Sequence, residues 1–233
     1  KDAFDMLRPD QNFGGLLKVV GGFNGEDNYK GVASLYGKLG NGLGLMATYV
    51  RQDGGDYDDG NGDRVNPTAY DHRRGQLKLT GLFDAHSFDL SAERLEDTGT
   101  YYERPHMTNF AGRFILSYHE MSRSTVSYNH RYNPDSELVD VQATLYHNRS
   151  DYQNHRNTTG ALYGYGEQTS YGFDLRNTAR WNNLDLVYGI DYRRDQLDAT
   201  QQATPPAFWG STEQHASVAG LYAQASWRFA PAW

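Results

Sequence analysis

Apolar and polar residues alternate along much of the chain, with the period of two that is typical of a β-strand with one apolar face. In the segment 171–181, the polar row contains Asp174, Arg176 and Arg180. The apolar row of the same segment consists of Tyr171, Phe173, Leu175, Ala179 and Trp181. The segment 184–193 repeats this arrangement after the turn Asn182-Asn183. The alternation predicts two long strands joined as a hairpin.

The same pattern predicts about ten antiparallel strands over the whole chain. They fall near 13–24, 28–40, 42–53, 72–84, 86–97, 110–132, 138–152, 168–181, 184–198 and 216–229. Helical periodicity is hard to find, and each of the 25 glycines would destabilise a helix interior by about 1 kcal/mol. The sequence therefore predicts an all-β fold.

The connections between the predicted strands alternate between short turns and long polar loops. Short connections lie at 40–42, 84–85, 133–137 and 182–183, and long ones at 53–71, 98–109, 152–167 and 198–215. Short turns at one end and long loops at the other are typical of an outer-membrane β-barrel, whose inner face is polar and whose outer face is apolar. The pattern favours an antiparallel transmembrane β-barrel over the alternative, a soluble all-β binding module.

Composition and charge exclude several other classes of protein. The chain has 233 residues, 38% of them hydrophobic and 14% aromatic, which is too rich in rings for a disordered chain. It has no cysteine, which excludes disulfides and thiol chemistry. No run of about 18 apolar residues is present, so a transmembrane helix is excluded. The formal net charge of -7 argues against nucleic acid as a partner.

Two stretches carry a resemblance to a known family. The opening, Lys1 to Gly15 (KDAFDMLRPDQNFGG), is similar to the point where TonB-dependent outer-membrane receptors leave their plug domain and enter the first barrel strand. The stretch from Arg123 to Tyr146 resembles a strand, periplasmic turn and strand of the same family. The layout of strands and loops agrees over nearly the whole chain.

This resemblance implies a 22-stranded barrel in the outer membrane of a Gram-negative bacterium. It implies uptake of a ferric siderophore or a similar scarce metal complex, with energy from the TonB–ExbB–ExbD complex. We expect residues 1–12 to connect plug and barrel, and residues 13–233 to form about ten strands of the barrel. The plug domain is not present in this chain, and the rest of the barrel is expected beyond Trp233. The partners expected are the lipid of the outer membrane, the siderophore and the TonB complex, and no bound cofactor is expected apart from the transported ligand.

The long loops hold the residues that we expect to contact the cargo. A ferric siderophore is bulky, often aromatic and frequently anionic, so rings and guanidinium groups suit it. The ligand-binding residues predicted on this basis are Tyr101, Tyr102, Arg104, His106, Tyr163, Tyr165, Phe208 and Trp209. The same side chains could instead pack their own loops together.

Other chemistry has weaker support in the sequence. The loop 53–63 contains five aspartates, whose oxygens suit calcium, but it lacks the glutamate that ends an EF-hand loop. His86 lies near Asp84 and Asp89, and His72 follows Asp71, which leaves a self-contained ten-stranded barrel, either a protease or an adhesin, as the alternative. No Gly-x-Ser-x-Gly motif or phosphate-binding loop is present. We therefore predict no catalytic residues, no resident metal and no enzyme activity.

Overall fold

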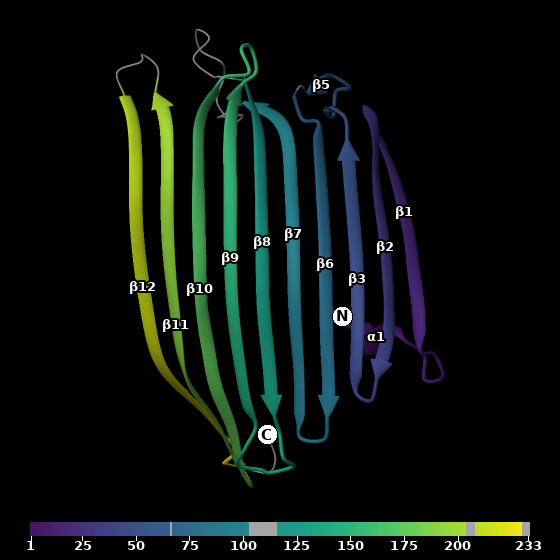
Figure 1. The fold of residues 1–233 in the computed structure, drawn as a ribbon, viewed down its shortest axis with the longest axis vertical. Helices are drawn as coiled ribbons and strands as arrows, with labels where there is room; N and C mark the ends of the chain where they lie inside the picture. The colour runs from purple at the N-terminus through teal and green to yellow at the C-terminus, as the bar shows by residue number, and fades with distance from the viewer. Residues whose placement is uncertain (66, 103–115, 204–207, 230–233) are drawn as a thin grey trace.

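Ten of the strands in the computed structural model form one continuous antiparallel sheet (Figure 1). The structure describes residues 1–65, 67–102, 116–203 and 208–229, and at 201–203 and 208–211 it describes the backbone. The strands of this sheet are β1 (Phe13–Asn24), β2 (Glu26–Gly40), β3 (Leu43–Gly54), β6 (Tyr70–Phe83), β7 (His86–Tyr102), β8 (Leu116–Tyr132), β9 (Val141–Arg156), β10 (Leu162–Trp181), β11 (Leu184–Ala203) and β12 (Phe208–Trp227). Each strand pairs with its neighbours in sequence order. The all-β prediction and its ten strands are confirmed.

The connections divide the sheet into two ends. Short turns join β2 to β3, β6 to β7 and β10 to β11 at what we call the short-turn end. Longer connections lie at the opposite, long-loop end, where β4 (Tyr57–Asp58) and β5 (Arg64–Val65) pair as a small hairpin between β3 and β6 (Figure 1). The predicted separation is present only in part, because Gly25 alone joins β1 to β2 and residues 157–161 join β9 to β10 at the long-loop end, whereas residues 133–140 join β8 to β9 at the short-turn end.

Strand register separates apolar from polar side chains onto the two faces of the sheet. Leu175 pairs with Ile190, which pairs with Leu221, so these three apolar residues share what we call the outward face. Asp174 pairs with Asp191 one position along, on the opposite, inner face. Hydrogen bonds between side chains connect the strands on the inner face, such as the 2.7 Å bond that the Tyr222 hydroxyl of β12 donates to Asp174 of β10.

Burial shows that this sheet is a single layer. Among the described residues, the buried hydrophobic side chains are Ala3, Met46, Tyr163 and Ala179. Large apolar side chains on the outward face are exposed instead, including Leu17 at 79% and Leu221 at 84%. A soluble sandwich would bury such residues between two sheets, so the outward face suits contact with lipid. Among the described residues, no helix is both long and apolar enough to cross a membrane.

The short helix α1 (Ala3–Met6) lies on the inner face near the short-turn end. Asp2 caps it, because its carboxylate accepts hydrogen bonds from the backbone N–H groups of Phe4 and Asp5 at 2.8 and 3.0 Å. Its Ala3 and Phe4 fill the space beside Gly44 of β3, where a Cβ would lie 2.9 Å from the Phe4 ring. The segment 1–12 is thus anchored to the inside of the sheet, and its role as a connection to a plug stays a prediction.

The expected extents of three long loops were wrong. Strand β7 continues to Tyr102, β9 and β10 leave only 157–161 between them, and β11 and β12 include most of 198–215. The row of apolar side chains on the outward face ends before these strands do. From Leu77 and Ala92 toward the long-loop end, the outward face carries Arg73, Arg94 and Glu96. Alternation cannot reveal a strand that is polar on both faces, although its backbone pairing continues. The strand expected from residue 110 is described from Leu116 onward.

An ion-pair cluster fastens the turn between β8 and β9. The Asp140 carboxylate is 3% exposed and accepts two hydrogen bonds from the Arg131 guanidinium, at 2.7 and 2.8 Å. Arg180 of β10 lies 3.9 Å away, and Asn177 accepts a 2.9 Å bond from the Asp140 N–H. The Arg131 hydrogen bonds hold the pKa of Asp140 below its usual range, against the opposing effect of burial. One carboxylate thus connects three strands.

Because neighbouring residues of a strand lie on opposite faces of the sheet, spin labels attached at neighbouring positions should have different surroundings. This chain has no native cysteine, so a nitroxide can be placed at single sites through Leu175→Cys and Arg176→Cys in the intact protein in lipid vesicles, with any cysteine outside residues 1–233 replaced by serine. We expect collisions with dissolved oxygen to dominate at 175, which faces lipid, and collisions with a water-soluble paramagnetic reagent at 176. The reverse pattern would show that the faces are assigned the wrong way round.

The Asp140 cluster predicts a pH-dependent loss of stability. Asp140→Asn should lower the free energy of unfolding of the receptor by about 1–3 kcal/mol at pH 7, since it removes a charged acceptor from a buried site. A lowered carboxyl pKa gives stability above the unfolded-state pKa of about 3.9, and this contribution is lost as the pH falls below that value. The gap between wild type and variant in denaturant titrations should therefore shrink as the pH falls below about 4. Asp135→Asn, in the exposed part of the same turn, is the control, and an equal effect of both variants would contradict the prediction.

Candidate functional site

A patch rich in histidine, tyrosine and arginine lies on the inner face near the long-loop end. Strand register places its members in three rows across β6, β7 and β8. From the long-loop end inward, the rows are Tyr70, Gly99 and His119; His72, Asp97 and Met121; and Arg74, Leu95 and Arg123. We call these nine residues the inner patch. The alternation of each strand brings them to one face, although they are far apart in sequence.

His72 is oriented by its neighbours in the inner patch. Its Nδ1 lies 3.0 Å from the Oδ1 atom of Asp97, and its ring stacks on Tyr70 with centroids 4.8 Å apart. The Oδ1 atom of Asp97 makes no hydrogen bond of good geometry among the described residues, so the contact is an ion-pair distance that places the carboxylate beside Nδ1 of the ring. This arrangement makes Nε2 of His72 the atom suited to bind a metal centre.

Tyr101 and His119 form the second aromatic pair, at the edge of the inner patch. Tyr101 folds over Gly99, where a Cβ would meet the Tyr101 hydroxyl at 2.3 Å, and its ring centroid lies 5.7 Å from that of His119. The Nε2 atom of His119 is buried without a hydrogen-bond partner among the described residues. Tyr101 lies well beyond the apolar belt, and burial, with smaller effects from Asp97 and Tyr70, raises its pKa. A raised pKa disfavours the phenolate, so the imidazoles are the better metal ligands here.

The third row of the inner patch carries excess positive charge. Arg74 forms an ion pair with Glu93, and Arg123 lies 3.9 Å from the same carboxylate. Two guanidinium groups therefore share one carboxylate, and both arginines are about half exposed. Such an arrangement can accept a further carboxylate from a ligand.

The predicted ligand-binding residues are spread over the long-loop end. Tyr101 and Tyr102 end β7, Tyr163 and Tyr165 lie in β10 rather than in a loop, and Phe208 and Trp209 begin β12. Arg104 and His106 lie outside the described residues. Of this set, the structure brings Tyr101 to the inner patch. Cargo contact by all eight residues stays a prediction.

Tyr163 has a packing role in the sheet. It is 1% exposed, its hydroxyl lies 2.6 Å from the Ser117 hydroxyl, and the Arg156 guanidinium lies 5.6 Å from its ring centroid. The register of β10 shifts between Leu162 and Gly164, so Tyr163 occupies a β-bulge. Tyr165, two residues on, is 48% exposed.

Sequence reasoning did not predict a ligand site at His72, Asp97 and His119. His72 attracted notice through its neighbour Asp71, but adjacent residues of a strand point to opposite faces, and its partner is Asp97 on the next strand. The same alternation separates His86 from Asp89, whose carboxylate faces inward and accepts a 2.7 Å hydrogen bond from Thr80. Asp71 with His72 and Asp89 with His86 are therefore wrong as catalytic pairs. Applying the period-two alternation to β6 and β7 together would have placed His72 and Asp97 on the same face of the sheet.

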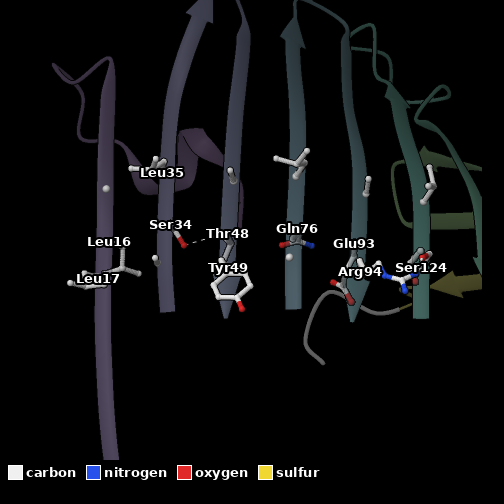
Figure 2. A pocket seen from close by; sticks show the side chains of 18 residues that line it. Leu16, Leu17, Ser34, Leu35, Thr48, Tyr49, Gln76, Glu93, Arg94 and Ser124 are labelled. Atoms are coloured by element: carbon white, nitrogen blue, oxygen red, sulfur yellow. Dashed lines mark hydrogen bonds between the residues drawn. The ribbon is translucent and has the colours of Figure 1, made fainter. Parts of the chain in front are cut away.

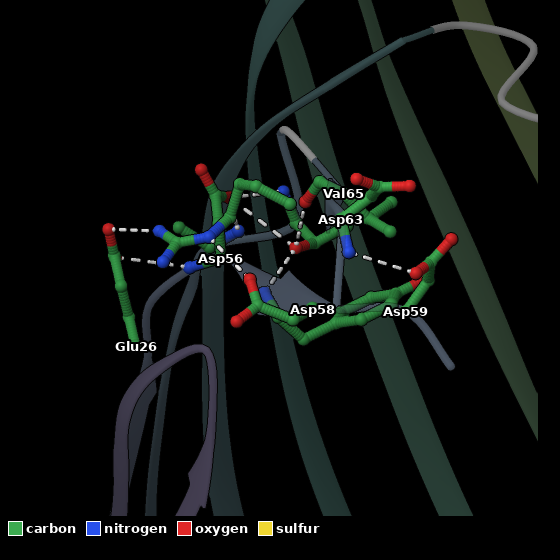
Figure 3. Close-up of polar contacts among 10 residues, drawn as sticks. Glu26, Asp56, Asp58, Asp59, Asp63 and Val65 are labelled. Carbon is green, nitrogen blue, oxygen red and sulfur yellow. Dashed lines mark hydrogen bonds and ion pairs between the residues drawn. The ribbon is translucent and has the colours of Figure 1, made fainter. Parts of the chain in front are cut away.

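The acidic loop between β3 and β6 is tied together by its own hydrogen bonds (Figure 3). Arg64 donates to Asp58 at 2.8 Å and to Glu26 at 2.6 Å. Asp59 accepts from the backbone N–H groups of Asn61 and Asp63, and Asp56 accepts from those of Thr68 and Ala69. In the described part of the chain, no three His, Asp or Glu side chains converge to hold a metal ion. The carboxylates therefore serve the loop itself.

A large hollow lies on the outward face, over β1, β2, β3, β6, β7 and β8 (Figure 2). It has a volume of about 1010 Å³ and is lined mainly by outward residues, among them Leu17, Leu35, Tyr49 and Leu77. Its lining is mainly apolar, and small residues such as Ala33 and Gly75 lie between the larger side chains and leave the space open. Lipid chains suit this surface, and it lies on the face opposite to the inner patch.

Comparisons with known proteins agree with this fold. No family model matches the chain. "Heme transporter BhuA" of Brucella ovis is 26% identical over 196 residues, which is 82% of this chain and 28% of that protein. "Heme/hemopexin utilization protein C" of Haemophilus influenzae is 27% identical over 93 residues, 40% of this chain and 13% of that protein. The chain thus spans well under a third of the curated relatives it matches.

Solved structures give the same answer for the fold. The FrpB iron transporter from Neisseria meningitidis aligns with a TM-score of 0.78 at 20% identity, over 99% of this chain and 41% of that one. The Serratia marcescens hemophore receptor HasR aligns with a TM-score of 0.75 at 19% identity, over 97% of this chain and 33% of that one.

The fold is that of part of a transmembrane β-barrel like those of these proteins. The similar proteins are receptors and transporters rather than enzymes, and they reside in the outer membrane of Gram-negative bacteria. The predicted resemblance to TonB-dependent outer-membrane receptors is confirmed, and this chain corresponds to part of their β-barrel.

The buried position of Tyr163 predicts a loss of stability that its exposed neighbour does not share. Tyr163→Phe keeps the ring but removes the hydroxyl from Ser117, so the free energy of unfolding of the receptor should fall by about 0.5–1.5 kcal/mol. Tyr165→Phe is the matched control and should leave it unchanged, as measured in denaturant titrations. Equal stability of both variants would contradict the packing role.

Proposed function

We propose that this chain belongs to an outer-membrane receptor that takes up haem, with the inner patch as a contact surface for the cargo. The observation that carries this proposal is the His72–Asp97 pair on the inner face, beside Tyr101 and His119. Haem iron is commonly held by histidine or tyrosine side chains. The curated relatives named as haem proteins support the same cargo.

Three groups of side chains in the inner patch match the three parts of a haem molecule. The Nε2 atom of His72 is suited to bind the iron, and the buried Nε2 atom of His119 would join it as a second ligand after its ring turns toward the cargo. Leu95 and Met121 offer apolar surface for the porphyrin ring. Arg74 and Arg123, which share Glu93, suit the two propionate groups. This complementarity lies on adjacent strands of a rigid sheet, so binding would require little rearrangement of the backbone.

Transport would follow from the place of the inner patch on the inner face. A cargo held near the long-loop end is positioned to move along the polar inner face toward the short-turn end. We propose that the energy comes from the TonB–ExbB–ExbD complex, as the family resemblance implies. The polar inner side chains, such as Arg176 and Asp174, would keep this path hydrated.

A ferric siderophore is the second candidate cargo. The aromatic residues Tyr101 and Tyr102 at the long-loop end favour it, because rings stack on the aromatic chelating groups of many siderophores. The ferric enterobactin receptor PfeA from Pseudomonas aeruginosa has a similar fold, with a TM-score of 0.69 at 14% identity. Siderophore binding would need the loop aromatics but not the imidazole of His72.

The haem proposal predicts a specific effect of removing His72. In the purified full receptor, His72→Ala should weaken haem binding at least about tenfold and shift the Soret band, since an iron ligand is lost. Asp97→Asn should weaken binding less, about tenfold or below, because it changes only the orientation of His72. Absorption titrations with iron protoporphyrin IX measure both effects.

His147 provides the control for this experiment, because it lies on the outward face in the same sheet. His147→Ala should leave haem affinity and the Soret band unchanged. Wild-type binding by the double variant His72→Ala, His119→Ala would refute the proposed ligands. Tight binding of a ferric catecholate by wild-type receptor that binds no haem would favour the siderophore candidate instead.

A further inference from the structure

Two histidines face each other on the outward side of the sheet, at the short-turn end and away from the inner patch. The Nδ1 atom of His86, at the start of β7, lies 3.1 Å from the Nε2 atom of His130 in β8. The two rings are nearly parallel, at 10°, with centroids 5.2 Å apart. In the register, His86 pairs with Tyr132 and His130 pairs with Phe88, so the histidines are diagonal neighbours on one face.

Flanking tyrosines hold both imidazole rings. Tyr132 stacks on His86 with centroids 4.6 Å apart, and Tyr128 lies against His130 at 6.2 Å and 12°. The four rings form an aromatic row along β7 and β8. His86 is exposed and is the first residue of β7, directly after the turn from β6, so water and solutes can reach the edge of the pair from the short-turn end. The pair is thus positioned by the backbone and by aromatic contacts on both sides.

The distance between the two nitrogens fits a shared metal ion. Metal–imidazole bonds of about 2.05 Å to two nitrogens 3.1 Å apart would subtend about 98° at the metal. This angle lies between the right angle of square-planar or octahedral sites and the tetrahedral angle. A modest rotation of each ring about χ2, a soft torsion in histidine, would turn both lone pairs toward one point.

We propose that His86 and His130 form a binding site for a divalent transition-metal ion, with copper(II) preferred over nickel(II) and zinc(II). Imidazole nitrogens suit all three ions, and copper(II) has the highest affinity of them for a given nitrogen site. Two neutral imidazoles bind the ion without losing a proton, because the donor ring moves its hydrogen to its remote nitrogen. In the described part of the chain no carboxylate or imidazole joins as a third ligand, so water or an external ligand completes the coordination.

The site would connect β7 to β8 beside the turn that joins β6 to β7. It is separate from the inner patch, because His86 and every second residue after it in β7 face outward, whereas Asp97 and Tyr101 face inward. Metal binding here therefore goes beyond the proposed haem uptake. A bound ion would cross-link two strands at the exposed rim of the sheet and stabilise the folded state, since the unfolded chain does not hold the two rings together.

Copper(II) alone, without haem, provides the test. The full receptor in detergent is titrated with copper(II), and binding is followed by equilibrium dialysis and by electron paramagnetic resonance. We expect one copper(II) per chain whose spectrum shows coupling to two nitrogens. His86→Phe and His130→Phe keep a stacking ring but remove the nitrogens, and each should lose that one copper(II).

Two further measurements keep the outcome clear. His147→Phe, on the outward face of β9, should retain the full copper(II) stoichiometry and the two-nitrogen spectrum. Copper(II) should raise the melting temperature of the wild type and not that of His86→Phe. If His86→Phe folds and binds as much copper(II) as the wild type with the same spectrum, the proposal is overturned, and the two histidines share only a hydrogen bond.

Discussion

Every backbone polar group of a chain in lipid must find its partner within the protein, and this constraint organises the whole structure. The strands meet this constraint by pairing with their neighbours in one antiparallel ladder from β1 to β12, and among the described residues only the outer edges of β1 and β12 lack a neighbouring strand. Since the ladder satisfies the backbone, the side chains are free to differ between the faces. The outward face can be apolar without a second layer to cover it, and the inner face can be charged without being buried. The scarcity of buried apolar side chains among the described residues follows directly.

The same ladder explains how chemistry is assembled on the inner face. A rigid sheet holds residues of three strands in fixed rows, so His72 meets Asp97 and Tyr101 meets His119 across strand boundaries. None of these pairs depends on a loop. The loop between β3 and β6 uses its own carboxylates for Arg64 and for backbone N–H groups. In the described residues of the long-loop end, the side chains available to contact a cargo therefore lie on strands. The carboxylates of the loop between β3 and β6 already bind groups of the loop itself.

Charges on the inner face are balanced locally, which lets the face stay polar without excess repulsion. Asp140 joins Arg131 and Arg180 at the short-turn end, and Tyr222 bonds Asp174 in the middle of the sheet. Arg74 and Arg123 likewise share one carboxylate, which leaves one positive charge in excess. This excess lies beside the two histidines of the inner patch. An anionic metal complex would find both its ligands and its counter-charges at one place.

The sequence by itself determined the strands, the two faces and the layout of turns, because each follows from local alternation and turn residues. It placed Leu175 and Arg176 on opposite faces and indicated the family correctly. Only the tertiary structure decided where the strands end and which side chains meet. Strands such as β10 extend beyond the apolar belt on backbone pairing alone, which leaves no hydrophobic signal, so Tyr163 lies in a strand rather than a loop. The meetings of His72 with Asp97 and of His86 with His130 depend on register between strands, and register is set by pairing over the whole sheet rather than by any one segment.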